Sequence, residues 1–476
     1  MSGEPMSGID LAWLRMERAT NPMTIVAVLI LEGRVKHVQL RSLLAERLLR
    51  FDRFRELPVH DALGTRWARD QHFDLDVHLR VLRLPPRAGQ RQLEQAASKL
   101  ASAQLNPRHP LWQIHLIERY GKGSALIARF HHCYADGIAL MRVLLSLADA
   151  TPVPVAAAAS TAQATRGNSH DGLLSLVSPL TNLIGSAMSA VQRAGQGTAD
   201  LVSASLRTLA HPDQAAALAR QGATALREFA DIALLPEDPP TPLKGKLGSH
   251  KQVAWAQPLS FMEVRAVAHA LDCTINDVLL ASVAGALGSH LAKRGVSTDG
   301  LTIRALVPVN LRPADEQPQL GNQFGLVFAN LPIGERNPLA RVYAVHQDMQ
   351  RLKQSSQALV ALWLLTAMGL LPGVVEERAI ELFTAKGSVV VSNVPGPREP
   401  LYLAGARIAQ QFFWVPQAGD IGVGISLLTY DGSVHFGLIA DRNLISDPSD
   451  VARRFVNEFE RLLLHTLAGP LGARAS

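Results

Sequence analysis

ALIARFHHCYADGIALMRVLL, which runs from Ala125 to Leu145, places two adjacent histidines and an Asp-Gly pair between two apolar segments. The segment before the histidines is short and apolar, as expected of a buried strand. After Gly137, apolar residues recur at the spacing of one helix face, and this pattern predicts a helix. The histidines therefore belong to a connection between a strand and a helix.

The two histidines are expected to play different parts. Successive side chains of an extended segment point to opposite faces, so His131 and His132 cannot both enter one pocket from a regular strand. Asp136 follows across a turn, within reach of orienting an imidazole or anchoring the loop, and Gly137 permits backbone geometry that side chains would forbid. This pattern fits a lone general base. The alternative is that both histidines are buried residues bonded to the backbone, and that Asp-Gly is an ordinary turn.

Other chemistries fit this stretch less well. Opposed side-chain directions, and the lack of a paired His/Cys ligand cluster elsewhere, argue against a metal site. Cys133 as a nucleophile would need a base, and its neighbour His132 should point away from it. The sequence contains no G-x-S-x-G elbow and no Walker loop.

Composition and length limit the class of protein. A chain of 476 residues, 47% hydrophobic and 18% charged, is expected to form about two or three globular domains. The net charge of +6 favours anionic partners such as lipid headgroups or phosphorylated cofactors. Aromatics at 5% and the lack of Lys/Arg blocks argue against nucleic-acid binding. The two cysteines cannot build a disulfide framework and the N-terminus lacks a secretory pattern, so a cytoplasmic location is expected.

The order of predicted elements indicates an α/β or α+β fold. TIVAVLIL, Thr24 to Leu31, predicts a buried strand, and strand and helix patterns alternate over the latter half of the chain. An Ala-, Pro-, Ser- and Thr-rich segment, Thr151 to Gly172, and a second break at LLPEDPPTPLKGKLG interrupt this order. We predict an N-terminal domain over residues 1–150, a helical linker region over 151–245 and a C-terminal domain over 246–476.

Two uncharged apolar segments raise the question of a membrane. GLLSLVSPLTNLIGSAMSAVQ, from Gly172 to Gln192, has an apolar face opposite Ser, Thr, Asn and Gly. Interfacial helices usually carry Lys or Arg on the polar side, so packing against the protein body is favoured. SSQALVALWLLTAMGLLPGVV, from Ser355 to Val375, approaches the roughly 20 residues that span a bilayer. A buried or tunnel-lining helix is expected there, with surface membrane contact and spanning as alternatives.

HHCYADG fits HHxxxDG, the signature of the CoA-dependent acyltransferase superfamily, which includes chloramphenicol acetyltransferase, plant BAHD acyltransferases and peptide-synthetase condensation domains. Nearly from end to end, the chain resembles the bacterial wax ester synthase/diacylglycerol acyltransferase (WS/DGAT) family. The motifs that carry this resemblance are IDLAWLRMERATNPM, Pro110-Leu111-Trp112, TINDVLLASVAGAL (Thr274–Leu287), VPVNLR (Val307–Arg312), LGNQFG (Leu320–Gly325) and SNVPGP (Ser392–Pro397). After Asn-Pro-Met the family commonly continues with a His-Val-Gly-like sequence, whereas this chain reads Thr-Ile-Val, and Met23 to Val26 are therefore expected to shape the substrate entrance differently.

The resemblance implies two similar chloramphenicol-acetyltransferase-like domains, with mixed sheets flanked by helices and a central substrate tunnel. It implies that His132 is the base that takes the proton from an alcohol hydroxyl as that oxygen attacks the thioester of a fatty acyl-CoA. Asp136 is then structural and fixes the loop, while His131 and Gly137 support the motif. The acceptor is a long-chain alcohol, a diacylglycerol or both, and no metal or other cofactor is implied besides the co-substrate acyl-CoA. Such an enzyme is expected to associate peripherally with the inner face of the membrane or with lipid inclusions.

Further residues match motifs of the family. Asn276 is a candidate to donate its amide to the developing oxyanion, with Asp277 capping the helix that follows; alternatively, Asn276 is itself the cap. Trp112 has a large apolar body that suits an acyl channel, although a core tryptophan gives the same pattern. The prolines of SNVPGP stiffen a loop that is expected to form a strand crossover between the domains.

Two other functions stay open. A condensation-type enzyme, which uses carrier-protein thioesters, shares HHxxxDG, but TINDVLLA and SNVPGP are of WS/DGAT type and no fused carrier domain is visible. A non-catalytic lipid-binding protein with this fold would be expected to carry a broken motif, yet His132, Asp136 and Gly137 are all present.

Overall fold

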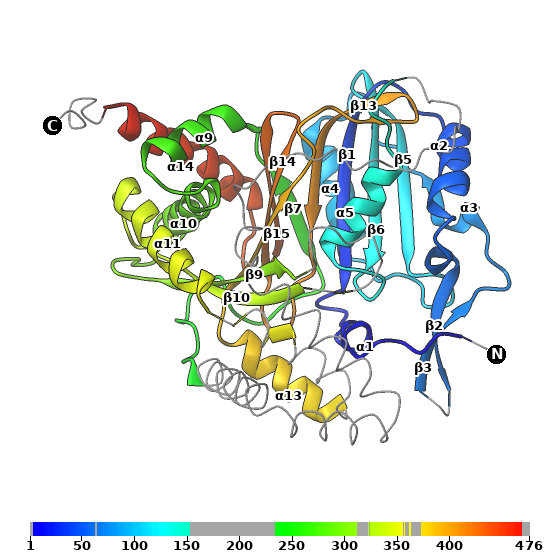
Figure 1. Cartoon of the computed structure of the whole chain (residues 1–476), viewed down its shortest axis with the longest axis horizontal. Coiled ribbons are helices and arrows are strands. Elements are labelled where there is room, and N and C mark those ends of the chain that lie inside the picture. The colour runs from blue at the N-terminus through cyan, green and yellow to red at the C-terminus, as the bar shows by residue number, and fades with distance from the viewer. Residues whose placement is uncertain are drawn as a thin grey trace, which may run out of the picture.

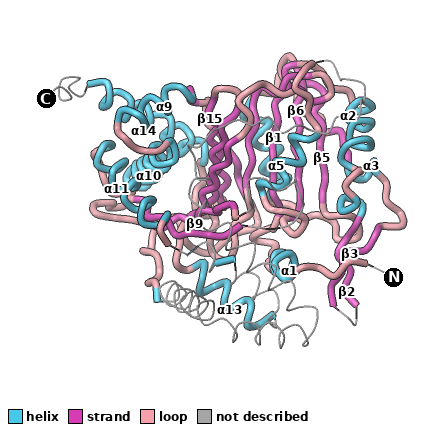
Figure 2. Tube along the Cα trace, viewed as in Figure 1, coloured by secondary structure: helices cyan, strands magenta, loops and turns pink. Residues whose placement is uncertain are grey.

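Two β-sheets stand side by side at the centre of the computed structural model, which describes residues 3–61, 64–152, 234–311, 322, 324–355, 357, 361–362 and 373–468 (Figure 1). The first sheet has six strands in the order β12-β13-β1-β6-β5-β4. The second has seven, in the order β10-β9-β11-β14-β15-β7, with β8 paired to β15. Helices flank both sheets (Figure 2), so the mixed α/β architecture agrees with the sequence-based prediction.

The elements of the first part of the chain, up to residue 152, are α1 (Gly8–Arg15), β1 (Thr24–Glu32), α2 (His37–Leu43), a π-helical turn (Leu44–Leu48), a 3-10 turn (Asp52–Arg55), β2 (Glu56–Asp61), β3 (Gly64–Arg69), α3 (Leu75–His78), β4 (Leu79–Val81), α4 (Gln90–Ala101), β5 (Trp112–Tyr120), β6 (Gly123–His131) and α5 (Gly137–Ser146). From residue 234 onward they are β7 (Lys251–Trp255), β8 (Leu259–Ser260), α9 (Phe261–Ala270), α10 (Ile275–Lys293), β9 (Ile303–Asn310), β10 (Phe324–Leu331), α11 (Pro338–Lys353), α13 (Gly373–Thr384), β11 (Val389–Pro395), β12 (Tyr402–Leu403), β13 (Ala406–Trp414), β14 (Val423–Tyr430), β15 (Ser433–Asp441) and α14 (Pro448–Ala468).

β1 and β6 lie in the middle of the first sheet and position its functional end. β1 pairs antiparallel with β6 on one side and with β13 on the other. Both strands are buried over nearly their whole length, because their apolar side chains pack on both faces of the sheet. Thr24, the first residue of β1, pairs with His131, the last residue of β6. The predicted strands, and the predicted helix after the Asp-Gly pair, are therefore confirmed.

The two sheets exchange strands near the end of the chain. After β11 in the seven-stranded sheet, the chain enters the six-stranded sheet as β12 and β13 and then returns as β14. The SNVPGP segment ends β11 and leads into this crossover, as the sequence predicts. The first sheet is thus completed by residues from the C-terminal part of the chain, while the proposed division at residues 150 and 245 stays a prediction.

α10 is the central helix of the second core. It packs against α11 and α14 and buries nearly every side chain in the apolar cluster beneath the seven-stranded sheet. Among the described helices, α10 alone is long and apolar enough to cross a membrane. However, 83% of its apolar stretch is buried inside the protein. It is the core helix of a folded domain. Beyond residue 152, the predicted linker and the helix that follows it to residue 192 lie outside the described residues, as does most of the segment 355–375.

Candidate active site

His132 follows the last residue of β6 and is held by two backbone contacts. Its amide N donates to the carbonyl of Met23 at 2.7 Å, and its carbonyl accepts from Asn322 Nδ2 at 3.0 Å. Both partners come from segments distant in sequence, before β1 and before β10. The side chain is buried, with 4% of its surface exposed.

An aromatic stack fixes the plane of the His132 ring. The indole of Trp13, on α1, lies nearly parallel to the imidazole with 3.9 Å between ring centroids, and Phe324 lies on another side at 5.7 Å. Burial lowers the pKa of His132 to about 4, so the ring is neutral at pH 7 and keeps a lone pair. Among the residues whose placement is described, none bonds to its Nδ1, and the indole Nε1 of Trp13 is likewise buried without a partner.

His131 has a different environment. Its Nδ1 accepts a hydrogen bond from the backbone N of Cys133 at 3.2 Å, so the proton is on Nε2, which faces Glu17 Oε2 at 3.3 Å. The same carboxylate oxygen accepts from the amide N of Met23 at 2.5 Å. Burial opposes ionisation of Glu17, but the hydrogen bond from His131 holds the pKa of that carboxyl below its usual value. The prediction that one histidine serves the site while the other packs is consistent with these separate contacts.

Asn322 of the LGNQFG motif hydrogen-bonds residues of two other motifs, IDLAW and HHxxxDG. Its amide donates both to the His132 carbonyl and to Asp10 Oδ1, at 3.0 and 2.7 Å. Asp10 and Trp13 belong to IDLAW, and Asn322 belongs to LGNQFG. Both motifs contribute to the resemblance to the family, but no local sequence pattern places either of them at the histidine loop. Their shared location around one imidazole is the main feature that sequence reasoning missed.

Asp136 is the N-cap of α5, where its Oδ1 accepts from the amide N of Ala139 at 2.9 Å. This contact is consistent with its predicted role in anchoring the loop, which stays a prediction. The special backbone geometry expected of Gly137 is wrong, because Gly137 is the first residue of α5 and its φ is not positive. A Cβ at this position would lie 3.3 Å from Cγ1 of Val415, a tight contact that a shift of a few tenths of an ångström would relieve.

Cys133 is fully buried beside these groups. Burial raises the pKa of its thiol well above the usual value, so the thiol stays protonated at neutral pH. A nucleophilic role for Cys133 is disfavoured by this protonation, as the sequence suggested.

Comparison with known proteins identifies the family. Residues 6–279 match the wax ester synthase/diacylglycerol acyltransferase catalytic domain, and residues 320–463 match the WS/DGAT C-terminal domain. The chain belongs to this family. It is an acyltransferase, as predicted from HHxxxDG and the motifs around it.

Relatives and solved structures agree with this assignment. Two Mycobacterium tuberculosis proteins named as diacylglycerol O-acyltransferases are 26% and 28% identical to this chain, covering 96% and 98% of it and 95% and 92% of their own lengths. The fold is similar to that of the WS/DGAT enzyme from Marinobacter aquaeolei VT8, with a TM-score of 0.68 and 20% identity over 97% of this chain and 99% of that one. It is also similar to the first condensation domain of the calcium-dependent antibiotic synthetase, with a TM-score of 0.60 and 15% identity over 97% and 96%.

The Asn-Asp pair of this WS/DGAT chain lies at the start of α10. Thr274 is the N-cap and accepts from the amide N of Asp277 at 3.2 Å, while Asp277 Oδ2 accepts from the amide N of Thr274 at 2.9 Å. Asp277 therefore closes a capping box and also bonds His346 Nδ1 at 2.8 Å. The alternative that Asn276 is the cap is wrong. Asn276 Oδ1 accepts instead from Asn393 Nδ2 of SNVPGP at 3.0 Å, so two family motifs meet there.

Trp112 is a core residue in all its described contacts. Its indole N donates to the carbonyl of Phe54 at 2.8 Å, and its ring stacks on His78 with 4.3 Å between centroids. Only 1% of its surface is exposed. Contact between Trp112 and an acyl chain stays a prediction.

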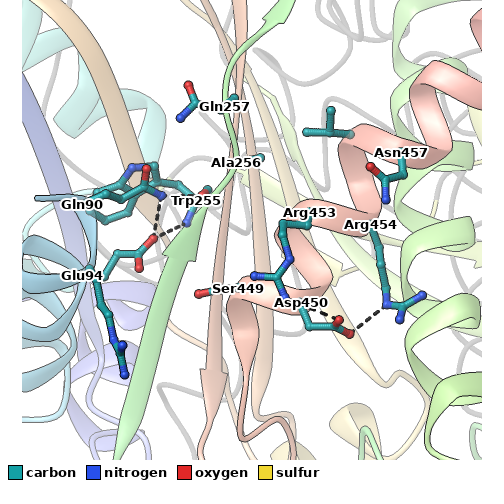
Figure 3. A pocket seen from close by; sticks show the side chains of 12 residues that line it. Gln90, Glu94, Trp255, Ala256, Gln257, Ser449, Asp450, Arg453, Arg454 and Asn457 are labelled. Atoms are coloured by element: carbon teal, nitrogen blue, oxygen red, sulfur yellow. Dashed lines mark hydrogen bonds and ion pairs between the residues drawn. The ribbon is translucent and has the colours of Figure 1, made fainter.

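Nothing in the described part of the chain gathers three or more His, Cys, Asp or Glu side chains in a way that would hold a metal ion. A pocket of about 560 Å³ lies away from the histidine loop, between α4 and α14 (Figure 3). None of the residues that the sequence nominated for the site lines it.

Proposed function

We propose that this acyltransferase moves a fatty acyl group from acyl-CoA to the hydroxyl of a long-chain alcohol or a diacylglycerol, with His132 as the general base. The observation that carries the proposal is a buried, neutral imidazole stacked on an indole, where neither His132 Nδ1 nor Trp13 Nε1 has a hydrogen-bond partner among the described residues. Family membership supplies the reaction class, and the relatives named as diacylglycerol O-acyltransferases support the lipid acceptor.

The proposed reaction needs one base and one hydrogen-bond donor. His132 accepts the hydroxyl proton as the acceptor oxygen forms a bond to the thioester carbonyl carbon. The carbonyl oxygen becomes an oxyanion, which the indole N–H of Trp13 stabilises. When the carbon–sulfur bond breaks, the imidazolium returns its proton to the departing CoA thiolate. Because burial destabilises the imidazolium, His132 holds that proton only transiently.

Asn276 stays a predicted second donor. Its amide oxygen is occupied by Asn393, which leaves its NH₂ group to donate. Asp136 and Asp277 are proposed to be positioning residues, since each holds the start of a helix next to a family motif. Neither carboxylate is assigned a proton-transfer step.

The test is thiol release from palmitoyl-CoA by the purified protein, with hexadecanol, with a diacylglycerol and with no acceptor. Acceptor-dependent release that His132→Ala abolishes, while its thermal unfolding matches the wild type, supports the proposal. His435→Phe is a matched control, because it replaces another buried histidine with a lowered pKa. Release that survives in His132→Ala contradicts the base. Release from a carrier-protein thioester, and none from palmitoyl-CoA, favours the condensation-type alternative.

We also propose that the protein works peripherally on the cytoplasmic face of a membrane or on a lipid inclusion. The acceptors are themselves lipids, and large apolar side chains are exposed near the end of α14, at Leu464 and Leu467. Flotation with vesicles that contain diacylglycerol tests this location. Protein that stays at the bottom of the gradient contradicts it.

A further inference from the structure

The pocket lies between α4, from the N-terminal part of the chain, and α14, the last helix of the C-terminal part. Figure 3 shows α14 carrying Arg453 and Arg454 on one side, α4 carrying Gln90 and Glu94 on the other, and the end of β7 between them. Its volume of about 560 Å³ is in the range of small-molecule sites. The lining residues are Gln90, Arg91, Glu94, Trp255, Ala256, Gln257, Ser449, Asp450, Arg453, Arg454, Val456 and Asn457.

We infer that this pocket binds the phosphate-bearing nucleotide end of acyl-CoA. The inference rests on the proposed function, which supplies acyl-CoA as the donor, and it names residues that contact this substrate away from the reacting atoms. Adenosine phosphates are polyanions, and guanidinium groups pair with phosphate oxygens through two parallel hydrogen bonds.

On the α14 side of the pocket, Arg and Lys side chains outnumber the carboxylates that pair with them. One carboxylate, that of Asp450, accepts from Arg454 Nε at 2.8 Å and Lys293 Nζ at 2.9 Å, and from His290 at 2.9 Å. Arg453 approaches Asp450 and Asp447 only to 3.7 and 3.8 Å. Since Asp450 is already occupied by closer donors, the exposed Arg453 guanidinium keeps hydrogen-bonding capacity for a ligand.

The α4 side adds a second cation and little opposing charge. Arg91 is exposed on α4. The neighbouring carboxyl of Glu94 is buried and accepts from Gln90 Nε2 at 2.9 Å and from the amide N of Trp255 at 3.2 Å. Its hydrogen bonds are therefore directed into the protein. An anion between Arg91 and Arg453 would be attracted from both helices.

The pocket also lies within reach of the catalytic loop. Trp255 in its wall lies 6.2 Å from the ring of Trp414, and Trp414 pairs with Val26 of β1. Two residues further along β1, Thr24 pairs with His131. With about 3.4 Å per strand residue and about 5 Å between paired strands, this route from Trp255 to His131 is on the order of 20 Å long. The pocket wall at Trp255 and the ring of His132 lie on opposite faces of the six-stranded sheet, so an acyl-CoA molecule that occupies both would pass around the end of β1.

The experiment compares two donors in the Arg91→Ala/Arg453→Ala double variant. With palmitoyl-CoA we expect KM to rise about tenfold or more at unchanged kcat, because charge-assisted contacts to phosphate are lost. With S-palmitoyl-N-acetylcysteamine, which lacks the nucleotide, we expect wild-type kinetics. Arg336→Ala, which removes an arginine that is 82% exposed elsewhere, is the control and should leave KM for both donors unchanged.

A wild-type KM for palmitoyl-CoA in the double variant, or equal losses with both donors, overturns the inference. Calorimetric titration with CoA itself separates this outcome from failure of the proposed function. If the wild type transfers no acyl group, CoA binding that weakens about tenfold or more in the double variant still supports the site. CoA binding that is absent in the wild type, or equal in both proteins, rejects it.

Discussion

Replacing Trp13 by Phe tests whether the indole N–H serves the reaction. The phenyl ring retains an aromatic plane over His132, whose centroid lies 3.9 Å from that of Trp13, and removes only the donor and part of the ring. Loss of one oxyanion donor typically lowers kcat by about 10²–10³-fold. Stability should change little. The Trp13 N–H is buried and no described residue accepts from it, a penalty of about 1–3 kcal/mol that the substitution relieves. The lost packing costs a similar amount, on the order of 1–2 kcal/mol.

The assay is steady-state thiol release from palmitoyl-CoA with saturating hexadecanol, run beside urea unfolding. Trp414→Phe is the control, since it deletes another buried indole N–H that has no partner among the residues with a described position, and it leaves the histidine loop intact. Asn276→Ala is run in parallel. Near-normal turnover in Trp13→Phe together with a loss of about 10²–10³-fold in Asn276→Ala would transfer the donor role to Asn276. Normal turnover in both would refute side-chain donation by either residue.

Two further predictions concern the protonation of two buried side chains, Cys133 and His435. Cys133→Ala should keep close to wild-type turnover, because burial keeps the thiol protonated; a folded but inactive variant, measured by the same thiol assay, would restore a covalent route. Burial lowers the pKa of His435 to about 4, and neither ring nitrogen has a partner within the part of the chain that the structure describes. Since the folded pKa lies below the unfolded value of about 6.5, its stabilising contribution is complete above pH 6.5 and is lost as the pH falls toward 4. Between pH 7 and pH 5, wild type should therefore lose about 2 kcal/mol more unfolding free energy than His435→Phe. Parallel denaturation profiles for the two proteins would show that His435 is not the group responsible.

Local sequence patterns predicted the elements around the site well. The β-branched run from Thr24 forms β1, and the change from apolar run to helical spacing around Gly137 gives β6 followed by α5. The opposite faces of a strand explain the separation of His131 from His132, because alternation depends only on neighbouring residues. The N-cap of α10 can also be predicted from the sequence. The pattern of Thr274 and Asp277, three residues apart before an apolar run, is a capping-box signature that points away from Asn276 as the cap.

The contacts that complete the site depend on tertiary packing. Asn322 bonds Asp10 and the His132 carbonyl across separations of 312 and 190 residues, and no local periodicity encodes such an encounter. The stacking of Trp13 on His132 likewise arises from how α1 packs, although the resemblance had already marked IDLAW as a family motif. For Trp112, sequence left a channel wall and a core position equally open. The structure shows how it is anchored, by the bond from its indole to the Phe54 carbonyl and by stacking on His78.

The pairing of β1 with β13 has a consequence for synthesis of the protein. Val26 pairs with Trp414 of β13, so one edge of β1 stays unpaired until β13 is synthesised near the end of translation. At about 5–20 residues per second, the interval is roughly 20–80 s. Throughout it, the apolar edge of β1 can pair with other nascent chains. A polypeptide released before residue 406 lacks β13 altogether. Premature termination therefore yields an aggregation-prone fragment in place of a smaller folded protein, and protection of this edge on the ribosome becomes a requirement for yield.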